Sequence, residues 1–218
     1  MKKTLLSIFL LGWGLSLYAQ EKTSLNWYSV SSSETILSWG SVKATGLETS
    51  DIVRFSPVFN YAVTFHKDFN DKMGFYFGLD LRNVGLITEL NDSVRVKQRT
   101  YNVGIPIALK FGDMKGNLVG LGINNEFAVN YKQKTFVNEE KAKTNIWFSD
   151  RTNIYLPAAY FEFKSKTGTY FRFKYYLTDY LIGENQAVNV AGVNYRPTQS
   201  TLMYLSVGFM LDNRKILE

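Results

Sequence analysis

The chain has 218 residues, of which 45% are hydrophobic and 20% charged, and it contains no cysteine. This composition indicates one ordered domain and excludes a disordered chain or a disulfide scaffold. The net charge of +6 comes from lysines and arginines scattered along the sequence, so nucleic acid is not an expected partner. The mean hydropathy of −0.14 fits a soluble protein and also a membrane β-barrel, in which half of each strand faces a polar interior.

The first twenty residues have the layout of a secretory signal peptide. Two lysines precede an apolar run at residues 5–17, and Ala19 supplies a small residue for cleavage. We therefore predict a signal peptide at residues 1–19 and a mature N-terminus at Gln20. An uncleaved membrane anchor is the alternative, but the apolar run is shorter than the ~20 residues that a helical span requires.

Beyond this segment, apolar and polar residues alternate with a period of two, which predicts β-strands. The clearest case is residues 170–178, where aromatic residues form one face while Arg172 and Lys174 lie on the other. The eight predicted strands cover residues 35–44, 52–66, 73–82, 101–111, 118–132, 154–164, 170–178 and 202–211. An even number of strands is what an up-and-down barrel needs if both termini are to lie on one side.

The predicted connections alternate in length. Short links cover residues 67–72, 112–117 and 165–168, whereas long polar links cover residues 83–100, 133–153 and 179–200. A short link at 45–51 departs from this alternation. Tight turns on one side and long loops on the other are typical of bacterial transmembrane barrels, with the tight turns in the periplasm. We therefore predict an all-β fold, an eight-stranded antiparallel up-and-down transmembrane β-barrel with an N-terminal signal peptide.

This prediction divides the chain into four parts. They are a signal peptide at 1–19, an N-terminal periplasmic segment at 20–34, an outer-membrane β-barrel at 35–211 and a C-terminal extension at 212–218. The expected location is the outer membrane of a Gram-negative bacterium, reached by export and cleavage of the signal peptide. Outer-membrane lipid would surround the barrel, and the barrel assembly machinery would insert it.

The two faces of the predicted strands differ in charge. The apolar faces of the seven strands after the first contain no charged residue and one strongly polar residue, Asn125. A barrel in lipid explains this exclusion, because Arg or Lys at mid-bilayer on the outer surface costs roughly 2–4 kcal/mol. Tyr101, Tyr131 and Tyr155 lie at the ends of apolar faces near the long links, which predicts an aromatic belt at that interface. A second belt near the tight turns would contain Phe65, Phe111 and Phe163.

Charged residues collect on the opposite, inward face. The predicted interior network consists of Arg54, Asp80, Arg82, Lys110, Glu126, Glu162, Arg172 and Lys174. The interior of an eight-stranded barrel is just wide enough for side chains to fill, so these charges would meet and close the lumen. A structural role follows from the high cost of an unpaired buried charge. The alternative is an incomplete network that leaves a narrow gated or proton-conducting path.

Residues suited to catalysis or metal binding are scarce. The one histidine, His66, lies beside the first tight turn and away from the long links. Without a second histidine or a cysteine, a Ser-His-Asp triad, a Cys-His pair and a zinc site are excluded or left with a misplaced member. We therefore predict no enzymatic activity, no catalytic or metal-binding residues and no cofactor.

Three segments carry a family resemblance. They are Ala19-Gln20, the strand at 101–111 with Ile-Pro-Ile at its centre, and Leu-Ser-Val-Gly-Phe at 205–209. Together they resemble the PorT-like outer-membrane β-barrel proteins of Bacteroidetes-type bacteria, which implies an outer-membrane location and no particular activity. Pro106 removes a ladder donor, so a bulge or a local break in pairing is expected there. The chain departs from the family at its end, because it continues to Glu218 instead of ending on the aromatic residue that the assembly machinery reads.

The sequence favours a small integral outer-membrane barrel with a plugged polar interior, acting through extracellular loops as a structural, interaction or accessory component. Trp147 and Phe148 are the candidate loop contacts for a surface ligand or envelope protein, because exposed aromatics among charges are typical of binding loops. Alternatively, both aromatics dip into the membrane interface. Two other functions stay open, a passive porin-like channel for small solutes and a soluble periplasmic lipocalin-like carrier with its apolar face inside.

Overall fold

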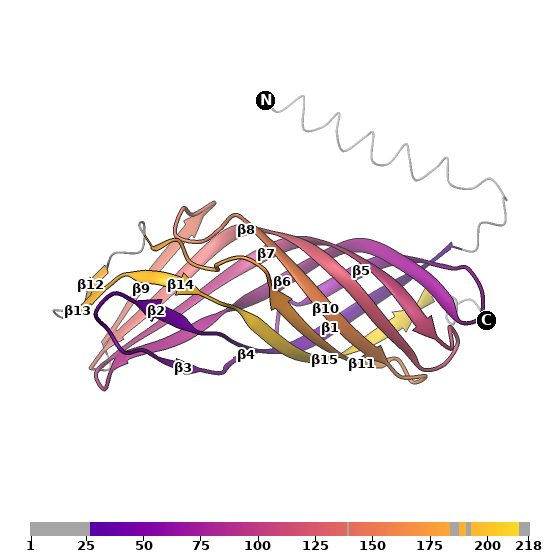
Figure 1. Ribbon diagram of the computed structural model, residues 1–218, viewed down its shortest axis with the longest axis horizontal. Helices are drawn as coiled ribbons and strands as arrows, with labels where there is room; N and C mark the ends of the chain where they lie inside the picture. Colours follow the sequence, from indigo (N-terminus) through magenta and orange to yellow (C-terminus); the bar gives the residue numbers. More distant parts are fainter. Residues whose placement is uncertain (1–26, 139, 184–187, 191–192, 214–218) are drawn as a thin grey trace, which may run out of the picture.

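A computed structural model describes residues 27–138, 140–183, 188–190 and 193–213. Eight strands form a closed antiparallel ring in which β15 pairs with β1 (Figure 1). In ring order they are β1 (Trp27–Trp39), β5 (Tyr61–Asp68), β6 (Met73–Asn91), β7 (Val94–Gly112), β8 (Leu118–Val137), β10 (Tyr155–Lys164), β11 (Thr169–Tyr176) and β15 (Met203–Asp212). The prediction of an eight-stranded antiparallel barrel is confirmed. The predicted signal peptide lies outside the described residues, as does the C-terminal extension beyond Asn213.

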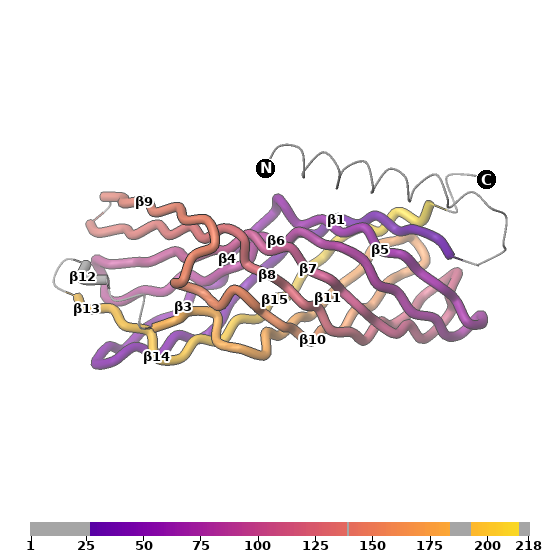
Figure 2. Tube along the Cα trace, turned by 90° about the horizontal axis from the view of Figure 1, so that it is seen from above, coloured from indigo at the N-terminus to yellow at the C-terminus, as the bar shows by residue number. Residues whose placement is uncertain are grey.

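The other seven strands lie toward one end of the barrel, and the tight turns lie at the other (Figure 2). These seven strands are β2 (Val42–Ala44), β3 (Ser50–Ile52), β4 (Arg54–Ser56), β9 (Glu140–Trp147), β12 (Val188–Val190), β13 (Val193–Tyr195) and β14 (Pro197–Ser200). Within the described ranges, no helix has the length and apolar character to cross a membrane. We call the end with these seven strands the loop end and the opposite one the turn end.

Much of what the sequence predicts as long loops is strand. β6 and β7 continue through residues 83–100 as one hairpin that turns at Asp92-Ser93, and β8 runs on to pair with β9. The prediction of polar loops is therefore wrong for these segments. Alternation continues there with its apolar residues turned inward, so the outward face is polar and resembles a loop in the sequence.

The first strand begins at Trp27, earlier than the predicted start at Thr35. Residues 27–34 consequently belong to the barrel rather than to a periplasmic segment, and they are needed there because 27–33 supply the pairing with β5. A run of three serines at 31–33 hides the alternation. Residues 20–26 lie outside the described part of the chain.

The predicted strand at 52–66 is also divided: Ile52 ends β3, and the rest forms β4 and the first part of β5. Residues 57–60 interrupt it, and Phe59 adopts a positive φ of 63° that a strand does not allow. The Asn60 side-chain amide donates to the Ser56 carbonyl at 2.9 Å and holds the two parts together.

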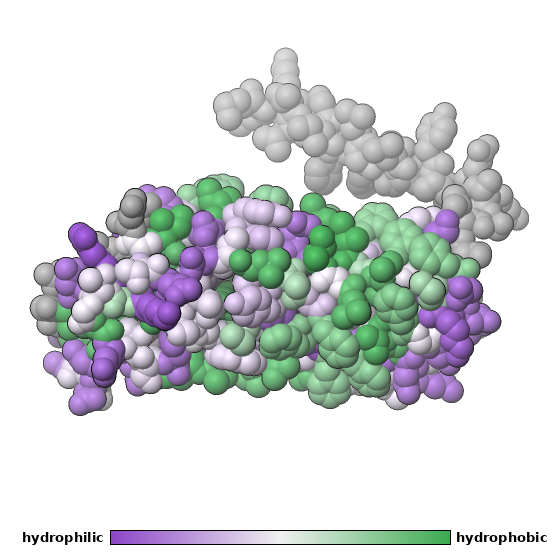
Figure 3. Space-filling view, viewed as in Figure 1, coloured by the Kyte–Doolittle hydropathy of each residue, from purple (hydrophilic) through white to green (hydrophobic). Residues whose placement is uncertain are grey.

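Apolar side chains face outward along the barrel, and charged side chains face inward. Leu79 is 61% exposed, for example, whereas the neighbouring Asp80 is 3% exposed. On the face drawn in Figure 3, hydrophobic surface extends from the middle of the barrel toward the turn end, and hydrophilic surface gathers at both ends. This arrangement is that of a transmembrane barrel. It contradicts the lipocalin-like alternative, which requires the two faces to be exchanged.

A β-bulge changes the phase of β8 relative to the prediction. Tyr101 pairs with Asn130 and Asn102 pairs with Ala128, so Val129 is the extra residue. The prediction that Tyr131 belongs to the outer aromatic belt is wrong for this reason. Tyr131 is fully buried, and its hydroxyl donates to the Gln133 side chain at 2.7 Å.

Pro106 is accommodated by a local break in pairing, as predicted. The paired positions of β6 and β7 pass from Phe77 and Ile107 to Asp80 and Gly104, and they omit the proline without a change of register. On its other side, Pro106 stays in register with Asn124 of β8. The missing N–H of proline therefore affects one seam of the strand and not both.

Candidate functional site

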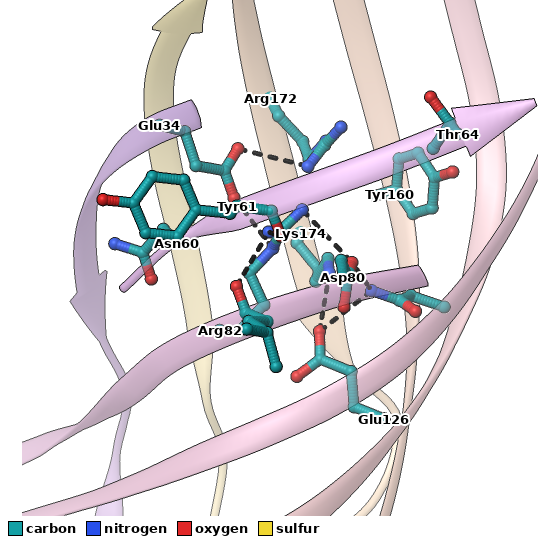
Figure 4. Close-up of polar contacts among 12 residues, drawn as sticks. Glu34, Asn60, Tyr61, Thr64, Asp80, Arg82, Glu126, Tyr160, Arg172 and Lys174 are labelled. Carbon is teal, nitrogen blue, oxygen red and sulfur yellow. Dashed lines mark hydrogen bonds and ion pairs between the residues drawn. The ribbon is translucent and has the colours of Figure 1, made fainter. Parts of the chain in front are cut away.

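Glu34 of β1 is shared by two arginines in a cluster of ion pairs inside the barrel (Figure 4). Its carboxylate forms an ion pair with Arg82, 3.0 Å from Nε, and accepts a hydrogen bond from Arg172 Nη1 at 3.1 Å. The hydroxyls of Tyr170 and Ser206 donate to the same carboxylate at 2.9 and 2.8 Å. The Glu34 side chain has no exposure to solvent. Donors from β6, β11 and β15 thus replace the water that this buried charge has lost.

Three further ion pairs complete the central cluster. They join Arg82 Nη2 to Asp80 at 3.1 Å, Arg172 to Glu162, and Lys174 Nζ to Glu126 at 2.7 Å. Each of these side chains is at most 5% exposed. Every cation of the cluster therefore has at least one carboxylate partner, which is the condition under which charge is tolerated in an interior.

Amide and hydroxyl groups also donate hydrogen bonds to both carboxylate oxygens of Glu126. Tyr176 and Asn102 each donate to Oε2 at 2.7 Å, and Asn124 donates to Oε1 at 3.1 Å. Asn124 also donates to Asp80 at 2.7 Å, so it links two carboxylates. Side chains from β6, β7, β8 and β11 therefore meet at one level of the lumen.

The structure brings together Asp80, Arg82, Glu126, Glu162, Arg172 and Lys174, as predicted, but it places two other predicted members elsewhere. Arg54 is buried at the loop end and donates to the backbone oxygen and the side-chain oxygen of Asn83, at 3.0 and 2.6 Å. It forms no ion pair among the described residues, so its assignment to the network is wrong. Lys110 forms a separate pair with Asp68 at the turn end, at 2.5 Å.

Sequence reasoning missed two carboxylates, Glu34 and Asp68. The predicted boundaries place Glu34 in a segment outside the barrel, at 20–34, and Asp68 in a tight turn, at 67–72. A signal was present in the charge balance, because the predicted network held five cations and three carboxylates. Burial demands pairing, so two more acids were needed near the strands.

An apolar core fills the barrel at the loop end, beyond the charge cluster. Its fully buried members include Val84 and Leu86 of β6, Val96 of β7 and Leu202. Tyr180 packs in this core, and its hydroxyl donates to Thr100 Oγ1 at 3.3 Å. The same strands therefore enclose a charged interior at one level and an apolar interior nearer the loop end.

Trp147 and Phe148, the predicted loop contacts, are 66% and 68% exposed. The register places Trp147 opposite Asn130, and Asn130 opposite Tyr101. Trp147 therefore lies two strands across from Tyr101, a residue of the predicted outer aromatic belt.

His66 points into the barrel near the turn end. Its ring stacks between Tyr28 and Tyr76, with centroids 5.2 and 4.7 Å apart, and Nε2 lies 2.7 Å from Thr64 Oγ1. In the described part of the chain, no group of three metal-binding side chains comes together.

No protein-family model matches the sequence, and no curated protein matches it either. Three solved outer-membrane barrels are similar to it in structure. Neisserial surface protein A is 9% identical, with a TM-score of 0.43, and the match covers 84% of this chain and 96% of that one. The attachment invasion locus protein Ail of Yersinia pestis is 10% identical, with a TM-score of 0.36 and coverage of 84% and 99%. The outer membrane protein OprG of Pseudomonas aeruginosa is 12% identical, with a TM-score of 0.36 and coverage of 85% and 95%.

Proposed function

We propose that this protein is an integral outer-membrane barrel with a closed lumen, which acts through its loop end as a structural or interaction component of the cell surface. The exposed apolar band supports residence in a bilayer, and a closed β-barrel is one of two architectures that satisfy every backbone group in lipid. Export by the signal peptide at 1–19, insertion by the barrel assembly machinery and membership of the PorT-like proteins of Bacteroidetes-type bacteria are parts of this proposal.

One observation carries the proposal of a closed lumen: side chains fill the interior of the barrel at two successive levels. The ion-pair cluster around Glu34 occupies the membrane level, and the apolar core around Leu86 occupies the loop end. A solute would have to separate paired charges and then displace the packed side chains of the loop-end core. The porin-like alternative requires a gap in both.

The proposed orientation places the turn end in the periplasm and the loop end outside the cell, as in bacterial barrels generally. Trp147 and Phe148 then lie at the outer interface, where aromatic rings anchor a barrel in the headgroup region. We assign them this anchoring role in preference to contact with a soluble partner.

Conductance across a planar lipid bilayer tests the closed lumen. The purified protein, folded in detergent and shown to change its electrophoretic mobility on boiling, should insert and give no steady conductance steps. A large-pore porin inserted under the same conditions is the positive control. Reproducible open-channel steps from the wild-type chain would overturn the closed lumen and favour passive transport.

Cysteine labelling of intact cells tests the orientation. The chain has no native cysteine, so each variant has a single site for the label. Asp92→Cys lies at the tip of the β6–β7 hairpin, and Lys115→Cys lies in a tight turn at the opposite end. A membrane-impermeant maleimide should label the first variant in intact cells and the second only after lysis. The reverse pattern would contradict the proposed orientation.

A further inference from the structure

The outward face of β7 changes its chemistry at Tyr101. On the turn side of Tyr101, the outward residues from 103 to 111 are all apolar. On the loop side, the outward residues are Arg99, Lys97 and Arg95. These three span four residues at about 3.4 Å each, or about 14 Å of strand, beginning where the apolar band ends.

Neighbouring strands widen this row of cations into a basic surface. Four further lysines, Lys132 and Lys134 of β8 with Lys141 and Lys143 of β9, lie on the same face. We call the seven residues the cationic ladder. Among the described residues that pair in register with the cationic ladder, one is a carboxylate: Glu89, opposite Arg95. No described residue forms an ion pair with any member of the ladder.

Like charges stand directly opposite one another in the ladder. Lys97 pairs in register with Lys134, Lys134 with Lys143, and Arg99 with Lys132. Such cross-strand pairs destabilise a sheet. Partial burial, followed by the positive charges of Arg95, Arg54 and Lys141, lowers the pKa of Lys97 below its ordinary value. The protein therefore retains a repulsive arrangement that a bound anion would relieve.

Two aromatic rings support the ladder from below. Phe136 lies under Arg95 and Lys97, at 5.2 and 5.4 Å from its ring centroid. Tyr101, at the height of the outer belt, lies under Arg99 and Lys132, at 5.5 and 4.9 Å. Packing on aromatic faces restricts these long side chains, so they lose less freedom when they bind a ligand.

The ladder borders a groove of ≈460 Å³. Its lining comprises Ile52, Val53, Arg54, Phe55, Ile87, Arg95, Lys97, Arg99, Lys132 and Lys134. Phe55 and Val53 are strongly exposed apolar residues at the foot of this groove. Arg95 Nε is buried without a hydrogen-bond partner in the described structure. The groove thus combines an apolar surface, a row of cations and one N–H donor, Arg95 Nε, that has no partner in the described structure.

We propose that the cationic ladder binds the phosphorylated headgroup of a glycolipid in the outer leaflet. Acyl chains would lie against the apolar band, and phosphates would contact Arg99 and Lys132 first, because these two cations sit at the belt. Lys97, Lys134 and Arg95 would hold anionic groups further out along the sugar chain. This inference rests on the proposed orientation, which places the ladder outside the cell.

Binding of lipid A, a phosphorylated glucosamine disaccharide with acyl chains, tests the proposal with purified full-length protein in neutral detergent. The variant is Lys97→Gln/Arg99→Gln/Lys132→Gln, which removes both cations at the belt that would contact the lipid A phosphates and the next cation along β7. The matched control removes the same charge at the turn end, through Lys72→Gln/Lys115→Gln/Lys166→Gln, whose side chains are exposed. Heat-modifiable mobility shows that each protein is folded. We expect the ladder variant to bind at least about tenfold more weakly, because charge-assisted contacts are lost, and the control to bind like wild type.

Two other samples identify the source of the anion. Dephosphorylated lipid A should bind as weakly to wild type as lipid A binds to the ladder variant. Inositol hexakisphosphate, a soluble polyanion, should compete poorly. Equal affinity for the soluble polyanion would overturn the lipid assignment, and equal binding by the ladder variant and the control would overturn the site. Because the assay uses purified protein, its failure is distinguishable from a failure of the cysteine-labelling test of orientation.

Discussion

The membrane half and the loop-end half of this barrel share continuous strands and yet have exchanged faces. In the membrane half of β7, Lys110 points inward and Leu109 points outward. In the loop-end half of the same strand, Val96 points inward and Lys97 points outward. The surrounding medium explains the exchange, because lipid excludes charge from the outer surface whereas water favours it there. A strand's pattern therefore reports its surroundings as much as its secondary structure.

The largest expected effect comes from breaking the charged interior. Glu34→Gln leaves Arg82 and Arg172 without a shared carboxylate, and loss of one member of a buried ion pair costs about 3–5 kcal/mol. Urea unfolding of the protein in lipid vesicles measures the loss. Glu48→Gln, at an exposed site of the loop end, should leave the free energy of unfolding unchanged. Equal stability of the two variants would show that the cluster is not a structural element.

The apolar interior of the loop end is broken by Leu86→Ala. This side chain is 1% exposed, and truncation of a buried leucine costs about 2–5 kcal/mol. Hydrogen exchange should show the loss in amides of residues 84–98 and spare the membrane half of β6. The matched control is Leu81→Ala, which removes a lipid-facing side chain from the same strand. A loss spread evenly over the barrel would contradict the independence of the two interiors.

Two substitutions on the outward face of β7 test whether the two halves of the barrel face different media. Ile107→Lys puts a charge on the lipid-facing surface and should cost about 2–4 kcal/mol, whereas Lys97→Ile should change stability by less than about 0.5 kcal/mol. The free energy of unfolding in vesicles again provides the measurement. If both substitutions had the same effect, the boundary between the two media would not lie near Tyr101.

The smallest expected effect concerns space inside the charged half. A Cβ at Gly104 would lie 2.2 Å from Asp80 Oδ1 and 2.8 Å from Asn124 Oδ1, whereas at Gly120 the nearest atom, Glu162 Oε1, is 3.3 Å away. Gly104→Ala should therefore destabilise by about 1–3 kcal/mol, and Gly120→Ala by less. Urea midpoints of the two variants test the order, and a reversed order would mean that Asp80 and Asn124 move freely.

The membrane half could be predicted from the sequence because its alternation is uninterrupted. Neighbouring residues such as Leu79 and Asp80 show which face is outward and which is inward, because lipid excludes charge from the outward face. The loop-end half could not be predicted in the same way, since the inward turn of Val84 and Leu86 leaves a polar outer face that resembles a loop. Nor does alternation reveal a bulge, and one extra residue at Val129 moved Tyr131 from the surface to the interior.

The interior network was predicted in outline and not in its centre. Charges on regular strands, such as Arg172 and Lys174, fell on the expected face. Glu34 escaped because it ends a serine run that carries no alternation, and Arg54 was included although its strand leaves the main ring at residues 57–60. Pairing partners depend on which distant strands become neighbours, and local periodicity does not contain that information.

The seam between β1 and β15 links closure of the ring to burial of a charge. Val30 pairs with Asp212 across almost the whole described chain, so this pairing carries the largest loop-closure entropy of any strand pairing in the ring. Glu34 lies on that seam, and its donor Ser206 lies across it. Pairing of β15 with β1 therefore supplies part of the hydrogen bonding that compensates this carboxylate for the loss of water.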